Sequence, residues 1–225
     1  MYCHICFKSM QEETTWKDLL TPKLFEYICT ECEDQFERNS SPTCQKCMKR
    51  SEASICHDCK LWQQILTTDP LEQNISIYTY NDFMKDAIAR FKYRGDYEIQ
   101  MVWRKIILET FKKYFIHDKL TIMPIPLSEE RHQERGFNQA EALATSITYE
   151  PDTKTLIRID SGKQSKKSRY ERMHSANPFQ TTQPPPKHIL LIDDIFTTGT
   201  TIRQCAQTLK QAGAQSIKSL TLIRS

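Results

Sequence analysis

The sequence predicts an α/β fold in which helices flank a parallel sheet, preceded by a cysteine-rich module. Short apolar runs alternate with segments of helical periodicity from about residue 67 to the end, which is the pattern of strand–helix–strand units. Eight of the nine cysteines form four Cys-x-x-Cys pairs within the first 59 residues. The 225 residues suffice for a full α/β core and a small accessory module. We therefore expect two units, 1–66 and 67–225.

The last part of the chain carries the clearest pattern. Residues 189–192 are a short, continuous apolar run, which is typical of a buried parallel strand. Apolar residues at helical spacing over 202–212 predict a helix, and Gly213 stands where a left-handed residue would end it. Residues 216–223 alternate and predict a further strand. This stretch therefore predicts one strand–helix–strand unit.

Similar patterns predict the earlier elements. We expect strands at 75–80 and 120–123, with helices over 84–91 and 102–114 between them. A polar loop is expected at 128–136. Asn138, with Glu141 three residues later, forms a capping-box pattern and should begin another helix.

Two adjacent carboxylates and a threonine-rich turn follow the strand predicted at 189–192. Asp193 and Asp194 would lie at its carboxyl end, where open α/β sheets bind ligands. Hydroxyls and backbone N–H groups at the start of the next helix would form an anion site. A ribose 5-phosphate satisfies both halves, whereas a simple capped corner would need only one acid. The turn consists of Thr197, Thr198, Gly199, Thr200 and Thr201.

This stretch resembles the phosphoribosyl-diphosphate (PRPP) binding motif of type I phosphoribosyltransferases, in which an apolar strand, two acids and a Thr/Ser-Gly-x-Thr turn follow one another. The resemblance implies that the loop after the preceding strand binds diphosphate together with Mg²⁺. Arg131 and Arg135 would then offer forked donors to phosphate oxygens. The alternative is a solvated loop whose arginines face water.

Residues 154–179 are rich in lysine and arginine and show no sustained apolar period. We expect a mobile loop over 163–172 near the phosphate site. It would act as a hood that excludes water, or as a track for a nucleic-acid backbone, or as a plain surface loop. Neutralising Lys166, Lys167 and Arg169 would separate these alternatives, because each predicts a different loss of binding.

The paired cysteines predict two structural zinc sites. Two Cys-x-x-Cys pairs make one tetrahedral site, and four thiolates leave no open position for catalysis. Helix-like stretches after the second and fourth pairs favour sequential sites, although an interleaved arrangement is the alternative. The sequential sites are Cys3, Cys6, Cys29 and Cys32 for one ion, and Cys44, Cys47, Cys56 and Cys59 for the other.

Composition narrows the cellular setting. No stretch approaches the ~20 apolar residues that a membrane span needs, and the first residues show no signal-peptide pattern. We therefore expect a cytoplasmic protein with no membrane span and with reduced thiols. The net charge of +3 does not by itself indicate a nucleic-acid partner.

Over nearly its whole length the chain resembles the ComF family of phosphoribosyltransferase-like competence proteins. The cysteine array and segments 91–95, 124–127, 131–140, 169–179 and 190–201 carry this resemblance, and Arg-Gly-Phe-Asn-Gln at 135–139 is the most specific part. One departure is Met48-Lys49, because many relatives have a glycine after the third cysteine pair.

The resemblance implies binding of PRPP or a related phosphorylated ligand and a role in DNA uptake and transformation in natural competence. It also implies a helicase-like ATPase of the same operon as partner. Whether the protein transfers a phosphoribosyl group stays open, and no acceptor motif is visible. The alternative is a non-catalytic adaptor for that ATPase that binds single-stranded DNA.

Overall fold

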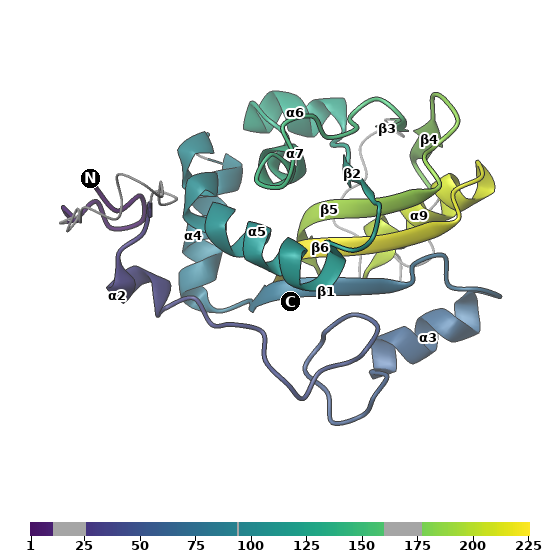
Figure 1. Ribbon diagram of the computed structural model, residues 1–225, viewed down its shortest axis with the longest axis horizontal. Coiled ribbons are helices and arrows are strands. Elements are labelled where there is room, and N and C mark those ends of the chain that lie inside the picture. Colours follow the sequence, from purple (N-terminus) through teal and green to yellow (C-terminus); the bar gives the residue numbers. More distant parts are fainter. Residues whose placement is uncertain (11–25, 94, 160–176) are drawn as a thin grey trace.

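The computed structural model describes residues 1–10, 26–93, 95–159 and 177–225 (Figure 1). Its centre is a four-stranded parallel sheet in the order β1-β6-β5-β2, and a separate antiparallel pair, β3-β4, lies beside it. This confirms the predicted α/β class. The strands are β1 (Gln73–Thr79), β2 (Thr121–Pro124), β3 (Leu156–Arg158), β4 (Phe179–Thr181), β5 (His188–Phe196) and β6 (Ser216–Arg224).

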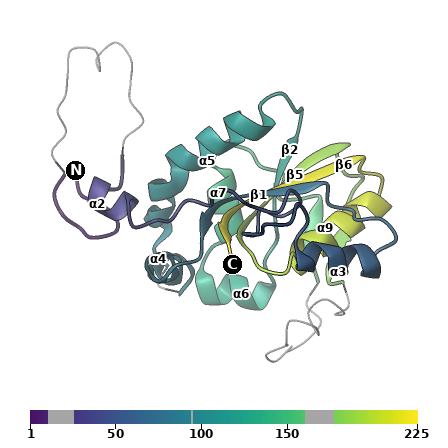
Figure 2. The ribbon, with the colours of Figure 1, turned by 90° about the horizontal axis from the view of Figure 1, so that it is seen from below.

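Helices cover both faces of the sheet (Figures 1 and 2). Three helices pack on one face, and α9 lies on the other with α3 on the same side. The first group is α4 (Asp82–Tyr93), α5 (Gln100–Phe115), which follows the 3-10 turn η1 (Tyr97–Ile99), and α7 (Gln139–Ala144). The remaining helices are α2 (Thr30–Glu33), α3 (His57–Ile65), α6 (Glu129–Arg135) and α9 (Thr200–Gln211).

The two faces of the sheet bury two separate apolar clusters. Successive residues of a strand point to opposite faces, so β5 contributes to both. Leu190 and Ile192 pack with α4, α5 and α7, whereas Ile189 and Leu191 pack with α9 and the second four cysteines. The continuous apolar run in β5 is thus explained by burial on both sides.

The segment predicted as a polar loop at 128–136 is a helix, α6, so that prediction was wrong. The Ser128 hydroxyl accepts a hydrogen bond from the Arg131 N–H and caps the helix, with two glutamates in the first turn. Gly136, at φ 78°, ends it in the left-handed conformation. The caps were visible in the sequence, but the absence of an apolar face hid the helix. The basic stretch at 163–172, with Lys166, Lys167 and Arg169, lies outside the described residues.

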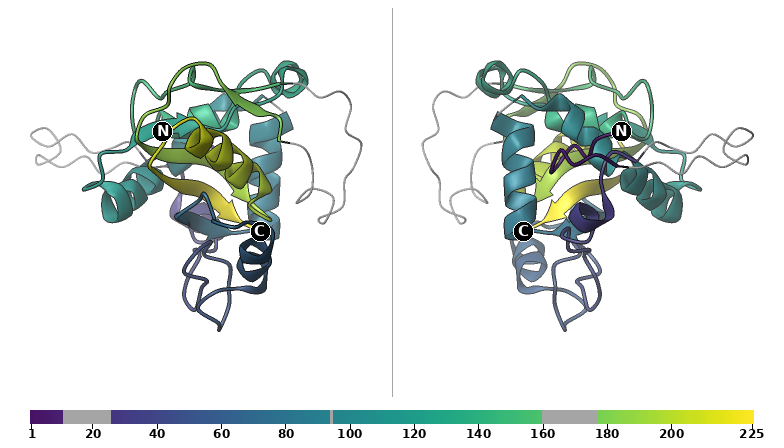
Figure 3. Two further views of the ribbon diagram at one scale, coloured as in Figure 1. Left: turned by 90° about the vertical axis from the view of Figure 1, so that its right-hand side faces the viewer. Right: turned by 90° about the vertical axis from the view of Figure 1, so that its left-hand side faces the viewer.

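The N-terminal region is spread along the sheet rather than gathered at one place. α2 lies at one end of the molecule and α3 at the other (Figures 1 and 2). Between them the chain runs along β1, where the Asn39 N–H donates to the Ile77 carbonyl over 2.9 Å and the Thr79 N–H donates to the Glu37 carbonyl over 3.0 Å. The segment before α3 projects from this edge of the sheet (Figure 3). The boundary at residue 66 stays a prediction.

Across the described residues, no helix combines the length and the apolar character that a membrane crossing requires.

Candidate ligand site and cysteine clusters

The candidate ligand site lies where β5 ends. The strand continues beyond the predicted 189–192 through both aspartates to Phe196, in parallel register with β2 and β6. Residues 197–201, which we name the phosphate loop after the ligand that the sequence predicts, follow at once and lead into α9. The structure therefore places the acidic pair and the loop at the carboxyl edge of the sheet, as the sequence predicts for a ligand site.

Asp193 and Asp194 face opposite sides of the sheet because they are neighbours in a strand. Asp194 forms an ion pair with Lys92 at the end of α4, and Lys92 Nζ lies 2.6 Å from Asp194 Oδ2. Both side chains are largely buried. The Asp194 N–H donates to Asp193 Oδ1 over 2.8 Å, which ties the two residues together. One carboxylate is thus neutralised by a lysine, while the other lies on the α9 side near Cys205.

The fold raises the pKa of the Asp193 carboxyl. Burial, followed by the charge of Asp194, raises its pKa from 3.8 to about 7, although the Asp194 N–H and Lys92 oppose the shift. A carboxyl with this pKa exchanges its proton near neutral pH. A hydrogen-bond donor or a cation bound beside Asp193 would therefore stabilise its charged form.

The phosphate loop is held in a tight turn. Gly199 adopts φ 76° as the N-cap of α9, and it has no side chain to cover the positive end of that helix. Thr198 and Thr200 are buried, and their hydroxyl oxygens lie 2.8 Å apart. Thr197 is half-buried and Thr201 is exposed. The hydroxyls thus divide, with two bonded to each other and two nearer the surface.

The two predicted arginines lie on α6, one turn apart. Arg135 Nη1 donates to Gln139 Oε1 over 2.9 Å, and its guanidinium lies over the Tyr93 ring at 5.7 Å. Its Nε is buried and has no hydrogen-bond partner among the described residues. Arg131 is exposed. Arg135 therefore lies against Tyr93, the residue after Lys92.

Lys92 is the site residue that sequence reasoning missed. A basic residue in the last turn of a helix is ordinary, because it complements the helix dipole, so it gave no distinct signal there. The segment Phe91-Lys92-Tyr93-Arg94-Gly95 did stand out as a family motif. The structure supplies a reason: it brings Lys92 to Asp194 and Tyr93 to Arg135.

The eight paired cysteines form two groups of four whose sulfur atoms all lie within 4.8 Å of one another. The sequential arrangement is the one observed. Site one is Cys3, Cys6, Cys29 and Cys32, and site two is Cys44, Cys47, Cys56 and Cys59.

Both groups have the dimensions of a tetrahedral metal site. A Zn–S distance of about 2.3 Å gives sulfurs nearly 4 Å apart in a tetrahedron. The Cys6 and Cys29 sulfurs, and likewise those of Cys47 and Cys56, lie 3.7 Å apart. Four thiols at this separation fit a zinc ion, whose positive charge the thiolates would balance. Both groups can therefore hold a metal ion.

The first halves of the two sites are structural repeats. The Cys3 N–H donates to the Lys8 carbonyl over 2.9 Å, and the Cys44 N–H donates to the Lys49 carbonyl over 2.8 Å. Phe7 and Met48 occupy matching left-handed positions, at φ 60° and 58°. Met48 thus adopts the backbone conformation for which glycine is the usual residue. The departure from the family pattern leaves the fold of the turn intact.

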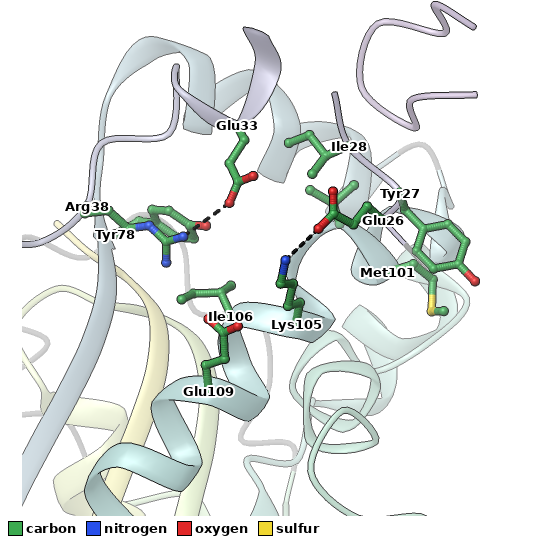
Figure 4. Close-up of a pocket in the computed structure, with 11 residues that line it drawn as sticks. Glu26, Tyr27, Ile28, Glu33, Arg38, Tyr78, Met101, Lys105, Ile106 and Glu109 are labelled. Atoms are coloured by element: carbon green, nitrogen blue, oxygen red, sulfur yellow. Dashed lines mark hydrogen bonds and ion pairs between the residues drawn. The ribbon is translucent and has the colours of Figure 1, made fainter. Parts of the chain in front are cut away.

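A shallow pocket lies between segment 26–38, β1 and α5 (Figure 4). Two ion pairs cross it: Lys105–Glu26 at 2.6 Å and Arg38–Glu33 at 3.4 Å. About half of each side chain is exposed, so these pairs contribute little to stability. The pocket marks the contact between the region around site one and α5.

Comparison with known proteins agrees with this geometry. Residues 123–225 match the model of the phosphoribosyl transferase domain, a region that includes the end of β2, the acidic pair and residues 197–201. The fold and the site therefore define a protein with a phosphoribosyltransferase-type domain.

Relatives of similar length extend the likeness to the whole chain. The chain is 39% identical to the competence protein ComFC of Bacillus subtilis, over 100% of this chain and 95% of that protein. It is 35% identical to ComFC of Streptococcus pneumoniae over the full length of both. The DNA utilization protein YhgH of Salmonella typhimurium is 22% identical over 88% of this chain. The chain thus belongs to the ComF family.

Proposed function

We propose that this protein binds PRPP, or a related phosphorylated ribose, at the carboxyl end of β5. We propose that it acts there in the cytoplasm during DNA uptake. The observation that carries the proposal is the placement of Asp193 and Asp194 directly before a loop that opens at the N-terminus of α9. The relatives named competence protein support the biological role.

Different residues of the site would contact different parts of the ligand. The loop N–H groups and the outer threonine hydroxyls would hold the 5-phosphate. The aspartates would accept hydrogen bonds from the ribose hydroxyls, and Lys92 would balance the negative charge of Asp194. Arg135 and Arg131 would offer donors to diphosphate. The carboxylate oxygens suit Mg²⁺, which would supply further neutralisation of the diphosphate when bound with it.

The same arrangement would support phosphoribosyl transfer. In such a reaction the bond from C1 of the ribose to a diphosphate oxygen breaks, and a bond from C1 to the acceptor forms. The leaving group takes the electron pair, so arginines and Lys92 near the diphosphate would stabilise the developing charge. The acceptor is the part of the reaction for which the site suggests no group.

Calorimetric titration with PRPP and Mg²⁺ tests the binding proposal. We expect saturable binding that falls at least about tenfold in the double variant Asp193→Asn and Asp194→Asn, because amides accept fewer hydrogen bonds from hydroxyls and do not offset Mg²⁺. The isosteric amides are preferable to alanine because they leave a partner for the buried Lys92. Glu26→Gln, in the pocket of Figure 4, is the matched control. Equal affinity in all three proteins would place the ligand elsewhere.

The second candidate is a non-catalytic adaptor that binds single-stranded DNA and docks on a helicase-like ATPase of the same operon. The relatives named DNA utilization protein favour it. Titration with a single-stranded oligonucleotide at two salt concentrations distinguishes the candidates. Steeply salt-dependent DNA binding without any PRPP binding would support the adaptor and overturn the first proposal.

We also propose that the two cysteine sites hold zinc as structural ions. The sulfur spacing supports this, and four thiolates would leave no position for a substrate. Metal analysis of protein purified under reducing conditions should find about two zinc ions per chain. Free thiols in a folded, metal-free protein would contradict it.

A further inference from the structure

Two buried arginines connect site two to the phosphate loop. Arg224, at the end of β6, donates from Nη1 to the carbonyls of Phe196 and Thr197, each over 2.9 Å. The same guanidinium donates from Nε to the Cys47 carbonyl over 3.1 Å and from Nη2 to Cys47 Sγ over 3.6 Å. One rigid, buried group therefore binds a zinc-ligand candidate, the last residue of β5 and the first residue of the loop at the same time.

Arg203, in the first turn of α9, makes the second connection. Its Nη2 lies 3.9 Å from Cys59 Sγ, and Nε and Nη2 donate to both carboxylate oxygens of Asp69 at 3.1 and 3.0 Å. Its Nη1 lies directly under Gly199, at 2.4 Å from where a Cβ would be. This Nη1 is buried with no hydrogen-bond partner in the described part of the chain. Arg203 thus fills the space between the cysteines and the loop.

Trp62 of α3 completes the contact. Its Nε1 donates to the Thr198 carbonyl over 2.7 Å, and its ring lies under the Arg203 guanidinium at 4.9 Å. α3 carries the last ligand of site two, Cys59, within the same helix. Loss of the metal would release this helix and break the hydrogen bond from Trp62 to Thr198, at the centre of the loop.

Charge explains why arginines occupy these places. A zinc ion with four thiolates carries an excess of about two negative charges, which is costly in a buried site. Two guanidiniums against the sulfurs offset that charge. If the metal and its thiolate charges were lost, both buried cations would lose partners and would be expected to move, and the loop carbonyls are bonded to one of them.

We propose that Arg203 and Arg224 are positioning residues that couple zinc at site two to the phosphate loop. Occupancy of site two shapes the loop for its ligand, and a bound ligand in turn slows zinc loss from site two, since such coupling is reciprocal. Within the described residues, site one makes no hydrogen bond to the loop. The ligand half of this proposal rests on the proposed phosphate binding at residues 197–201, whereas the loop-ordering half does not.

Hydrogen exchange of the ligand-free protein tests the coupling by itself. The matched variants are Cys56→Ser and Cys29→Ser, because each removes the first cysteine of the second pair of its site. We expect amide exchange over 196–201 to rise about tenfold in Cys56→Ser and to stay unchanged in Cys29→Ser. Equal exchange of the loop in the two variants would overturn the proposal.

Zinc release from the intact holo protein provides a second measurement that needs no destabilised variant. With a chromophoric chelator, PRPP and Mg²⁺ should slow the release of one of the two zinc ions about tenfold and leave the other unchanged. If PRPP binds but changes neither release rate, the coupling is wrong. If PRPP fails to bind the wild type, the proposed function fails, and the exchange experiment still decides the coupling.

Arg224→Lys tests the positioning residue directly, with Arg90→Lys as its control. Arg90 holds the site-one turn through the His4 and Ile5 carbonyls, at 2.8 and 2.9 Å. We expect Arg224→Lys to keep two zinc ions yet weaken PRPP binding about tenfold and speed loop exchange, because an ammonium cannot hold all three carbonyls. Arg90→Lys should leave both readouts as in the wild type. Parallel behaviour of the two variants would contradict the assignment.

Discussion

Sites one and two begin with the same Cys-x-x-Cys-x-Lys pattern and lie in different surroundings. Each starts with a turn of the same hydrogen-bonding pattern and ends with cysteines on a short helix. In site one Cys6 is exposed and Cys29 half-buried, whereas all four cysteines of site two are buried. Site two shares an apolar cluster with β5 and α9, the elements that carry the candidate ligand site. The same metal-binding motif therefore has a peripheral position in one case and a central one in the other.

This difference shows that ligand spacing determines whether a metal can bind but not what the bound metal supports. Site one ties the N-terminal segment to α4 through Arg90, which lies over the Phe7 ring at 5.0 Å. Site two contacts two strands, two helices and the loop through Arg203, Arg224 and Trp62. The first and last of the four predictions below compare the two sites, and the other two concern the candidate ligand site beside site two.

Loss of a zinc ligand should have the largest effect, and it should differ between the sites. We expect Cys56→Ser to lower Tm by more than about 10 °C, because structural zinc contributes about 10 kcal/mol or more and site two is part of the core. Cys29→Ser should release one zinc ion and lower the Tm of the α/β core by only a few degrees, about one kcal/mol. Calorimetry with zinc analysis measures both. Similar losses of Tm would remove the contrast.

The glycines provide the next largest effect. Gly199 and Gly136 have similar positive φ values, 76° and 78°. An added Cβ at Gly199 would lie 2.4 Å from both Arg203 Nη1 and Phe196 Cζ, while at Gly136 nothing lies within 4 Å. Gly199→Ala should cost about 2–5 kcal/mol from strain and overpacking, and Gly136→Ala about 1 kcal/mol from strain alone. Urea unfolding measures the difference, and equal costs would show that the Gly199 contact can relax.

Asp193 should make stability depend on pH near neutrality. Its pKa is raised from 3.8 to about 7 by burial and by Asp194, so the folded protein keeps a proton that the unfolded chain has released. The stability contributed by that proton is therefore lost as pH rises toward 7. Asp193→Asn should remove this decline and be more stable than the wild type at pH 8.

Thermal unfolding of the wild type and of Asp193→Asn between pH 6 and 8 measures this difference in stability. The two proteins are compared at each pH because zinc loss in acid affects both alike. An unchanged difference in Tm between the two proteins across this range would show that Asp193 does not titrate there.

The smallest effect is expected at the two left-handed turn residues. Phe7→Gly should change stability by less than about 0.5 kcal/mol, since relief of strain offsets the greater freedom of the unfolded chain and the lost contact with Arg90. Met48→Gly should cost about 1 kcal/mol, because Met48 packs against the core and its sulfur accepts from the Ser76 N–H at 3.3 Å. Chemical denaturation resolves the two. A stabilising Met48→Gly would mean that strain outweighs packing there.

The amino-acid sequence alone determined the features that depend on local pattern. The α/β class, the strand before Asp193, the helix after Gly199 and the eight cysteines were all predicted, since periodicity, caps and ligand spacing act over a few residues. The sequential arrangement of the cysteines was favoured and is the one observed. The helix α6 was missed, although its caps were visible, because a short exposed helix has no apolar period to reveal it.

Only the tertiary structure decided which distant residues meet. Lys92 reaches Asp194 because α4 packs on the face to which Asp194 points. Arg224, near the end of the chain, reaches Cys47 because β6 lies between β1 and β5. A buried charge must find a partner, but its sequence does not say which one, since the partner is chosen by strand order and by the face on which each residue lies. For that reason the two cysteine sites, each built from two Cys-x-x-Cys pairs, differ in what they hold in place.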